Sequence, residues 1–373
     1  MNSFRNATVY VEGRGLIKTD LSFDARIREI GSTSGEEIAL PEGAIVLPGF
    51  VDEHIHGAAG CDGMDGTKEA LSSLAKALPR EGTTSFLVTT MTDKKEKILG
   101  ALSAVRNFEN VDGAKILGVH LEGPFLSPAF AGAQAKEHLL APSAKVFDEL
   151  QTAAGGTIRL VTVAPELMGA KELISHLTAS GVHVSLGHSG ATYEEALEAI
   201  KLGADSATHT YNAMSKIHHR DLGLAGAALL CDELNAELIC DGKHVSFPAV
   251  ELLYKSKPQG KLILITDSMR AKYLPDGVSE LGGQTVFVKD GEARLENGTL
   301  AGSVLKMNEA VKNLASLSGD FCRAVDCATK NPAMHLGLYD EIGSIAIGKR
   351  ADFAVVDQNF NLLSTYVGGK RVF

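Results

Sequence analysis

Cysteine is scarce in this 373-residue chain, and no two cysteines form a CxxC pair. An odd, scattered set argues against a disulfide framework and against a zinc site built from cysteines. We therefore expect each one to be a small buried hydrophobic residue. The five are Cys61, Cys231, Cys240, Cys322 and Cys327.

Long apolar runs and an excess of positive charge are also missing. The first ten residues, MNSFRNATVY, contain no basic segment followed by an apolar stretch, and no later run approaches the length of a membrane span. A formal net charge of -10 repels polyanions, so nucleic acid and anionic membranes are excluded as expected partners. These absences predict a cytoplasmic enzyme, and a phosphorylated substrate would need a local cationic pocket.

Hydrophobic residues make up 45% of the chain, enough for one large domain with an appendage. Helical periodicity is clearest from Thr67 to Arg80, Ala170 to Ser180 and Thr192 to Leu202, the last opening with a capping box of Thr192 and Glu195. Eight short apolar runs alternate with such segments, as expected for a (β/α)8 barrel; a doubly wound sheet is the alternative. The runs begin near Ala44, Thr83, Lys115, Ile158, Val182, Asp205, Ala236 and Leu262.

The two ends of the chain have a different pattern. Residues 7–40 and 345–373 contain the strand-like runs TVYVEGRGL, ADFAVVD and KRVF, with turn residues and little helical periodicity. We expect these segments to pair into one small β domain.

The first barrel strand ends in VDEHIHG, which contains His54 and His56. Because side chains alternate along a strand, both imidazoles point the same way, a spacing that suits one metal ion. An isolated HxH pair is more often a surface or structural feature than a metal site. Whether this HxH pair is a metal site therefore depends on the residues at the other strand ends.

Four further strand ends each carry one His, Glu or Asp. A barrel delivers such residues to the rim at its C-terminal face. Each has a structural alternative: a histidine can be satisfied in the core, and the aspartate can cap a helix. One such residue could stand at a strand end by chance, but the whole set is much harder to explain by chance. The residues are Glu122 in HLEGPF, His188 in GHSG, His209 in THTYNAM and Asp267 in ITDS.

These residue types favour metal-assisted amide hydrolysis. A divalent ion held by imidazoles and a carboxylate lowers the pKa of bound water to about 7, which makes hydroxide available at neutral pH. Glu122, His188 and His209 could hold that ion, whereas His54 and His56 could complete its shell or bind a second one.

Two more residues extend this chemistry. Asp267 is placed to move a proton from the water to the leaving nitrogen. His244, in DGKH after the seventh strand, is the expected donor to the tetrahedral oxyanion or to the substrate.

An anion site is indicated near the sixth strand. The loop at Asn212 and Ala213 can present backbone N–H groups, and His218, His219 and Arg220 form a cationic cluster beside it. A sugar phosphate would fit there; a solvated basic surface turn is the alternative.

Together the motifs PGFVDEHIHG, HLEGPF, GHSGAT, THTYNAM, DGKHV, ITDSM, LAGS and GSIAIGKRADFAVVD resemble the N-acetylglucosamine-6-phosphate deacetylases of the amidohydrolase superfamily, over essentially the whole chain. The resemblance implies a (β/α)8 TIM-like barrel at 44–339 and a small β-sandwich built from 1–43 plus 340–373. It also implies a homodimer in amino-sugar catabolism that removes acetate from N-acetylglucosamine 6-phosphate.

The resemblance assigns roles by motif. Glu122, His188 and His209 match metal ligands, and Asp267 matches the catalytic acid and base. Zn²⁺ is the expected ion, with Fe²⁺, Mn²⁺ and Co²⁺ as alternatives, and the HxH pair matches members that hold two ions. Arg220 can reach the phosphate of the substrate from its own subunit or from the partner subunit. Substrate contacts are expected from Ala133, Gln134, Asn212, Ala213, Arg220, His244, Leu300, Ala301 and Gly302.

Three alternatives follow. An N-acetylgalactosamine-6-phosphate deacetylase would share nearly every motif, and the Gln134 that stands where some relatives have histidine leaves sugar recognition open. A dihydroorotase or hydantoinase would need a strand-borne lysine where Glu122 stands. A non-catalytic scaffold on the same barrel should have lost ligands that this chain retains.

Overall fold

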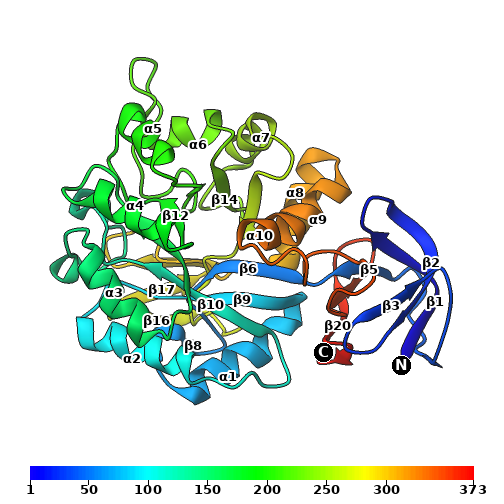
Figure 1. The fold of residues 1–373 in the computed structure, drawn as a ribbon. Helices are drawn as coiled ribbons and strands as arrows, with labels where there is room; N and C mark the ends of the chain where they lie inside the picture. Colours follow the sequence, from blue (N-terminus) through cyan, green and yellow to red (C-terminus); the bar gives the residue numbers. More distant parts are fainter.

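Eight parallel strands form the centre of the computed structural model, which describes residues 1–373 (Figure 1). The last strand returns to the first: the Asp267 N–H donates to the His54 carbonyl at 2.8 Å, and the His56 N–H donates to the Ser268 carbonyl at 3.0 Å. The predicted (β/α)8 barrel is confirmed. In sheet order its strands are β6 (Phe50–Ile55), β9 (Thr83–Thr89), β10 (Lys115–Glu122), β11 (Ile158–Val163), β12 (His183–Leu186), β13 (Ser206–Ala207), β14 (Asn235–Ile239) and β15 (Leu262–Ile265).

Helices follow the strands in turn. The predicted periodic segments all form helices, and Thr192 and Glu195 make the expected capping box at the start of α5. No helix is both long and apolar enough to cross a membrane. The helices are α1 (Lys68–Ala77), α2 (Lys95–Arg106), α3 (Ala144–Ala153), α4 (Ala170–Ala179), α5 (Tyr193–Lys201), α6 (Gly223–Leu230), α7 (Phe247–Ser256), α8 (Met307–Ser318), α9 (Phe321–Ala328) and α10 (Lys330–His335).

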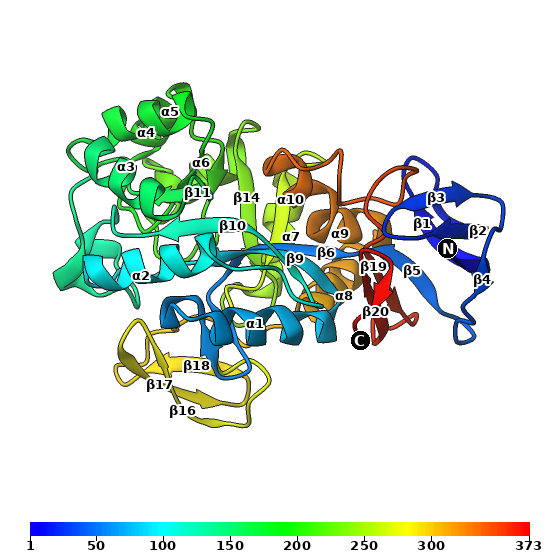
Figure 2. The same cartoon turned by 60° about the horizontal axis from the view of Figure 1, so that its bottom comes forward.

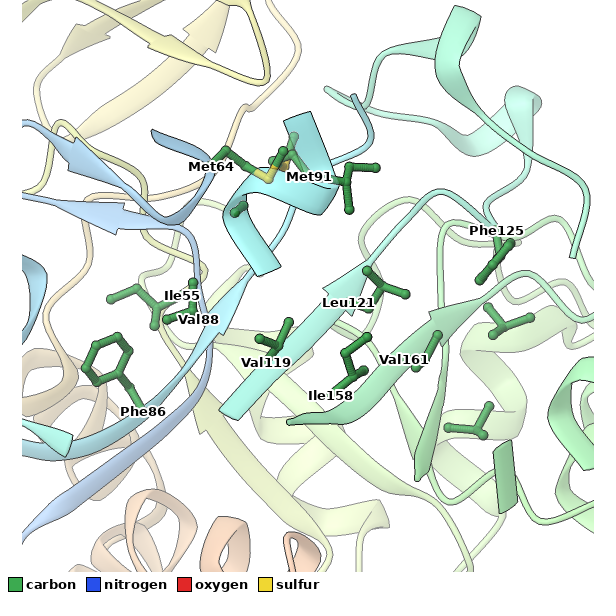
Figure 3. Packing of buried hydrophobic residues seen from close by; sticks show 14 of the residues in the cluster. Ile55, Met64, Phe86, Val88, Met91, Val119, Leu121, Phe125, Ile158 and Val161 are labelled. Carbon is green, nitrogen blue, oxygen red and sulfur yellow. The ribbon is translucent and has the colours of Figure 1, made fainter. Parts of the chain in front are cut away.

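The main core lies between the barrel and its helices. On β10, Val119 and Leu121 belong to this apolar layer (Figure 3), whereas His120 and Glu122 alternate with them and are also fully buried. Since strand side chains alternate, the hydrophobic set faces the helices and the polar set faces the barrel interior. The cysteines are free and buried or half-buried, as predicted.

The two chain ends form one eight-stranded sheet beside the barrel (Figure 1). The run that begins at Ala44 is split at Gly49: β5 joins the terminal sheet, between β1 and β19, and β6 begins the barrel. The sequence did not predict this division. The strands are β1 (Asn2–Val11), β2 (Gly15–Phe23), β3 (Ile27–Ile30), β4 (Glu36–Glu37), β5 (Ile45–Pro48), β19 (Phe353–Val356), β20 (Leu362–Val367) and β21 (Lys370–Arg371).

The terminal sheet curls over an aromatic core. Phe4 on β1 and Tyr366 on β20 have ring centroids 5.3 Å apart, although three strand spacings, about 14 Å in a flat sheet, separate their strands. Phe23 and Phe353 complete the cluster. The sheet thus packs against itself in the manner of the expected sandwich.

A second small sheet was not predicted. The strands β16 (Gly277–Leu281), β17 (Gln284–Lys289) and β18 (Glu292–Leu295) follow β15 and precede α8 in the chain, and they form a separate antiparallel sheet (Figure 2). A two-stranded hairpin, β7 (Gly57–Ala58) and β8 (Cys61–Asp62), lies between β6 and α1. Gln284 donates to the Ala133 carbonyl at 2.5 Å, which ties the β16–β18 sheet to a loop after β10.

Candidate metal centre and active site

The residues predicted at separate strand ends meet at the C-terminal rim of the barrel. We call them the rim cluster: His54, His56, Glu122, His188, His209 and Asp267, all of them buried. Glu122 contacts four of the five other side chains within 3.6 Å. The convergence on which the sequence hypothesis depended is therefore present.

Glu122, His188 and His209 form the tighter group. Glu122 Oε1 lies 3.0 Å from His188 Nε2 and 3.2 Å from His209 Nε2, and the two nitrogens are 3.0 Å apart. Ligands of a tetrahedral Zn²⁺ with bonds of about 2.0 Å stand about 3.3 Å from one another. The three atoms fit a shared divalent ion.

The HxH pair forms a second group with Asp267. His56 Nε2 lies 3.2 Å from both Asp267 Oδ1 and Glu122 Oε2, and His54 Nε2 lies 3.6 Å from Asp267 Oδ1 and from Glu122 Oε1. His54 Nε2 is buried without a hydrogen-bond partner. Glu122 thus contacts both groups: Oε1 faces His188, His209 and His54, and Oε2 faces His56.

The backbone at three of these residues is left-handed: φ is 47° at His188, 32° at His209 and 46° at Asp267. Non-glycine residues rarely adopt this conformation, which persists where the surroundings enforce it and is concentrated at functional sites. Each residue comes two positions after its strand ends. Because the chain turns there, the direction of the side chain no longer follows the alternation along the strand.

Neighbouring groups fix the orientation of the candidate metal ligands. The Phe130 carbonyl accepts from His188 Nδ1 at 2.9 Å, which leaves Nε2 free to face Glu122. Gln134 donates to Glu122 Oε2 at 2.9 Å and accepts from the Thr92 N–H at 2.7 Å. Contacts of this kind around a metal site set ring tautomers and ligand basicity.

The pKa values in the rim cluster are set largely by interactions between its own side chains. Burial alone would raise the pKa of Asp267, but the charges of His54 and His56 lower it to about 2. Burial alone would lower the pKa of His56, but hydrogen bonds to Asp267 and Glu122 raise it to about 10. The carboxylates therefore stay ionised and attract positive charge to this rim, either protons or a metal ion.

A cavity of roughly 390 Å³ opens above the rim cluster. It is lined by all the predicted substrate residues except Ala301 and Arg220. Ala301 is fully buried, and its N–H donates to the Ala293 carbonyl at 3.0 Å. The lining residues predicted for the substrate are Ala133, Gln134, Asn212, Ala213, His244, Leu300 and Gly302.

Arg220 lies on an exposed loop and does not line the cavity. Its Nη1 is 2.8 Å from His219 Nε2, and the His218 N–H closes a tight turn onto the Asp221 carbonyl at 2.9 Å. Within one subunit the predicted cationic cluster is therefore a surface turn, and only Asn212 and Ala213 of the proposed anion site reach the cavity.

The wall formed by Leu300 to Gly302 packs closely on Asp267. Gly302 has φ 64°, and a Cβ there would lie 3.2 Å from the Asp267 carbonyl oxygen. The next residue, Ser303, donates its N–H to that same carbonyl at 2.8 Å. This close approach holds the backbone of Asp267, which explains why glycine occupies the position.

His244 is oriented by Asp241. Its Nδ1 lies 2.6 Å from Asp241 Oδ2, and its backbone N–H donates to the other carboxylate oxygen at 2.8 Å. Burial would lower the pKa of His244, but the hydrogen bond to Asp241 raises it. His244 can therefore present Nε2–H to a substrate oxygen.

Sequence reasoning missed several residues. Met91, Phe130 and Thr299 line the cavity from loops that carried no distinctive pattern. Glu237 on β14 lies behind His54, and a charged residue in the middle of an apolar strand was a signal that could have identified it. His183 pairs with Asp205 at 2.6 Å, away from the cavity.

Comparison with known proteins agrees with this geometry. The sequence profile of the amidohydrolase family matches residues 45–372. The chain is 44% identical to the N-acetylglucosamine-6-phosphate deacetylase of Bacillus subtilis (strain 168), over 91% of this chain and 87% of that protein. This chain belongs to the N-acetylglucosamine-6-phosphate deacetylase family of amidohydrolases.

Other family members show the same relation. The N-acetylgalactosamine-6-phosphate deacetylase of Escherichia coli O157:H7 is 37% identical, over 87% of each chain. The crystal structure of the N-acetylglucosamine-6-phosphate deacetylase from Thermotoga maritima has a TM-score of 0.90 at 36% identity, covering 100% of this chain and 99% of that one. A mutant of the Mycobacterium smegmatis enzyme, solved with N-acetyl-D-glucosamine-6-phosphate, has a TM-score of 0.91 at 30% identity, covering 99% of this chain and 98% of that one.

Proposed function

We propose that the protein hydrolyses the acetamide of N-acetyl-D-glucosamine 6-phosphate to D-glucosamine 6-phosphate and acetate. The observation that carries this proposal is the rim cluster, in which Glu122, His188 and His209 share a centre beneath a cavity of roughly 390 Å³. The relatives named for this reaction support the choice of substrate.

A divalent ion bound to this trio would supply Lewis acidity that lowers the pKa of water and polarises a carbonyl. Zinc is our first choice because imidazole nitrogens and a carboxylate suit it, and His54 and His56 would support a second ion. His54 Nε2, buried and unpartnered, is the observation that favours two ions over one.

Asp267 is the proposed proton carrier. Its carboxylate lies beside His56 at 3.2 Å, inside the cavity and ionised over the working pH range. It takes one proton from the attacking water as the C–O bond forms and returns it to the amide nitrogen as the C–N bond breaks. The net reaction adds OH to the acetyl carbon and H to the nitrogen.

His244 and the loop at Asn212 and Ala213 are proposed to hold the sugar phosphate. His244, fixed by Asp241, presents a donor to the acetyl oxygen or to a ring hydroxyl, and Asn212 and Ala213 line the adjacent wall. Arg220 is proposed to bind the phosphate from the partner subunit, because it is exposed and outside the cavity of its own chain.

We further propose a cytoplasmic homodimer. The half-exposed Ile217 on the Arg220 loop supports an interface there. A monomer at micromolar concentration in analytical ultracentrifugation would contradict the dimer and the partner role of Arg220.

The decisive experiment is acetate release from the two epimeric sugar phosphates. We expect a higher kcat/KM for N-acetylglucosamine 6-phosphate than for N-acetylgalactosamine 6-phosphate. The reverse preference would assign the galactosamine activity, which the relative from Escherichia coli makes the second candidate. Acetate from neither, with no bound metal, would favour a non-catalytic scaffold.

A further inference from the structure

Glu237 is a buried carboxylate that the proposed reaction does not use. It lies on β14, is 0% exposed and does not line the cavity. One oxygen, Oε2, lies 2.9 Å from His54 Nδ1 and accepts from the His209 N–H at 3.0 Å. A single atom therefore contacts one residue from each of the two ligand groups.

The surroundings of Glu237 contain no other cation to balance its charge. Its one ion-pair partner is His54, and no lysine or arginine lies within 4.0 Å of it. The second oxygen, Oε1, has no hydrogen-bond partner. Because an unpaired buried charge is costly, a carboxylate here needs a persistent N–H donor on the histidine ring.

That requirement determines which nitrogen of His54 faces the rim. When Nδ1 carries the hydrogen and donates to Glu237, Nε2 keeps its lone pair and faces Asp267 and Glu122 at 3.6 Å. A carboxylate behind a ligating histidine fixes its tautomer and raises its basicity.

We propose that Glu237 is the positioning residue that turns the His54–His56 pair into a second ion site and links it to the first through His209. The inference rests on the metal centre of the proposed function but not on the identity of its substrate. A purely structural role, in which Glu237 only secures the backbone of His209, is the competing explanation.

Zinc binding to the metal-free full-length protein tests the proposal. Equilibrium dialysis against Zn²⁺, followed by elemental analysis, should give two ions per chain in the wild type. Glu237→Gln keeps the shape and one acceptor oxygen but removes the charge. It should leave the tighter ion in place and raise the Kd of the second about 10- to 100-fold.

Glu53→Gln is the matched control. Glu53 is also 0% exposed, also lies outside the cavity and also pairs with a histidine at 2.9 Å, but that histidine, His335, is not part of the rim cluster. This variant should bind both ions as the wild type does. A single ion in the wild type, or an unchanged second Kd in Glu237→Gln, would overturn the proposal.

The histidine tautomer gives a readout that needs no variant. In a long-range ¹H–¹⁵N spectrum of the zinc-loaded wild type, His54 should carry its hydrogen on Nδ1. A hydrogen on Nε2 would contradict the role of Glu237 directly. Neither experiment contains substrate, so a failed acetate assay and a failed role for Glu237 are separate results.

Discussion

Two clusters of histidine and carboxylate side chains lie in this barrel, and they differ in how their nitrogens are used. In the rim cluster, His188 Nε2 and His209 Nε2 stand 3.0 Å apart, and His54 Nε2 has no partner. In the second cluster, which we call the lower cluster, Glu53, His183, Asp205 and His335 form a chain of hydrogen bonds.

Every hydrogen bond of a histidine side chain in the lower cluster joins a ring nitrogen to a carboxylate oxygen. His183 Nδ1 lies 2.6 Å from Asp205, and His335 lies 2.9 Å from Glu53 and 3.5 Å from Asp205. Protons on the ring nitrogens are enough to satisfy these contacts, although three of the residues are close enough together to hold a metal ion. Proximity of ligand types is therefore weak evidence for a metal, whereas ring nitrogens that face one another are strong evidence.

The largest expected effect is on chemistry at the rim. Asp267→Asn should lower kcat by about 10³, because the amide cannot accept the proton from water. The metal content of the Glu122, His188 and His209 group should stay near normal, as elemental analysis can check. Near-normal turnover in this variant would remove Asp267 from the proposed role.

A pair of variants on one strand separates the two clusters. His188 follows β12 and His183 begins it, so both changes affect the same element. His188→Asn should lose the tightly held ion and most of the activity, whereas His183→Asn should retain both. Equal metal loss in the two variants would show that the clusters do not differ as described.

The lower cluster should make the stability of the folded protein depend on pH. Burial would lower the pKa of His335, but Glu53 and Asp205 raise it to about 10. Since the unfolded value is about 6.5, the stabilisation is complete below that pH and is lost as pH rises toward 10.

His335→Gln should therefore lower Tm more at pH 6 than at pH 9.5, with a loss of about 3 kcal/mol at the lower pH. The comparison of the two Tm differences, each against the wild type, is the measurement. A constant difference across this range would mean that His335 carries no charge in the folded protein.

The smallest effect should come from the surface turn. Arg220→Ala should raise KM about 10-fold for the phosphorylated sugar and leave KM for the unphosphorylated sugar unchanged, because only the first carries the anion. An equal change for both substrates would exclude phosphate binding by Arg220.

Much of this architecture could be predicted because each barrel strand carries local information. The alternation in VDEHIHG placed His54 and His56 on one face, and the end of each strand placed Glu122, His188 and His209 at one rim. The pairing of Glu237 with His54 could not be predicted, since it joins residues 183 positions apart through the curvature of the closed barrel.

Other features depend on tertiary context. The split at Gly49 follows from pairing of β5 with β19, more than 300 residues later in the chain. The β16–β18 sheet has short strands, and half of the residues of β17 are exposed, so it lacks a long periodic signal. In the proposed dimer, the position of Arg220 relative to the phosphate would depend on a second subunit, which the sequence of one chain does not specify.

Reconstitution of the metal-free enzyme tests the central claim most directly. Acetate release from N-acetylglucosamine 6-phosphate should vanish when the metal is removed by a chelator and return in proportion to the Zn²⁺ bound to the wild type. Full turnover by protein that elemental analysis shows to be metal-free would contradict the account.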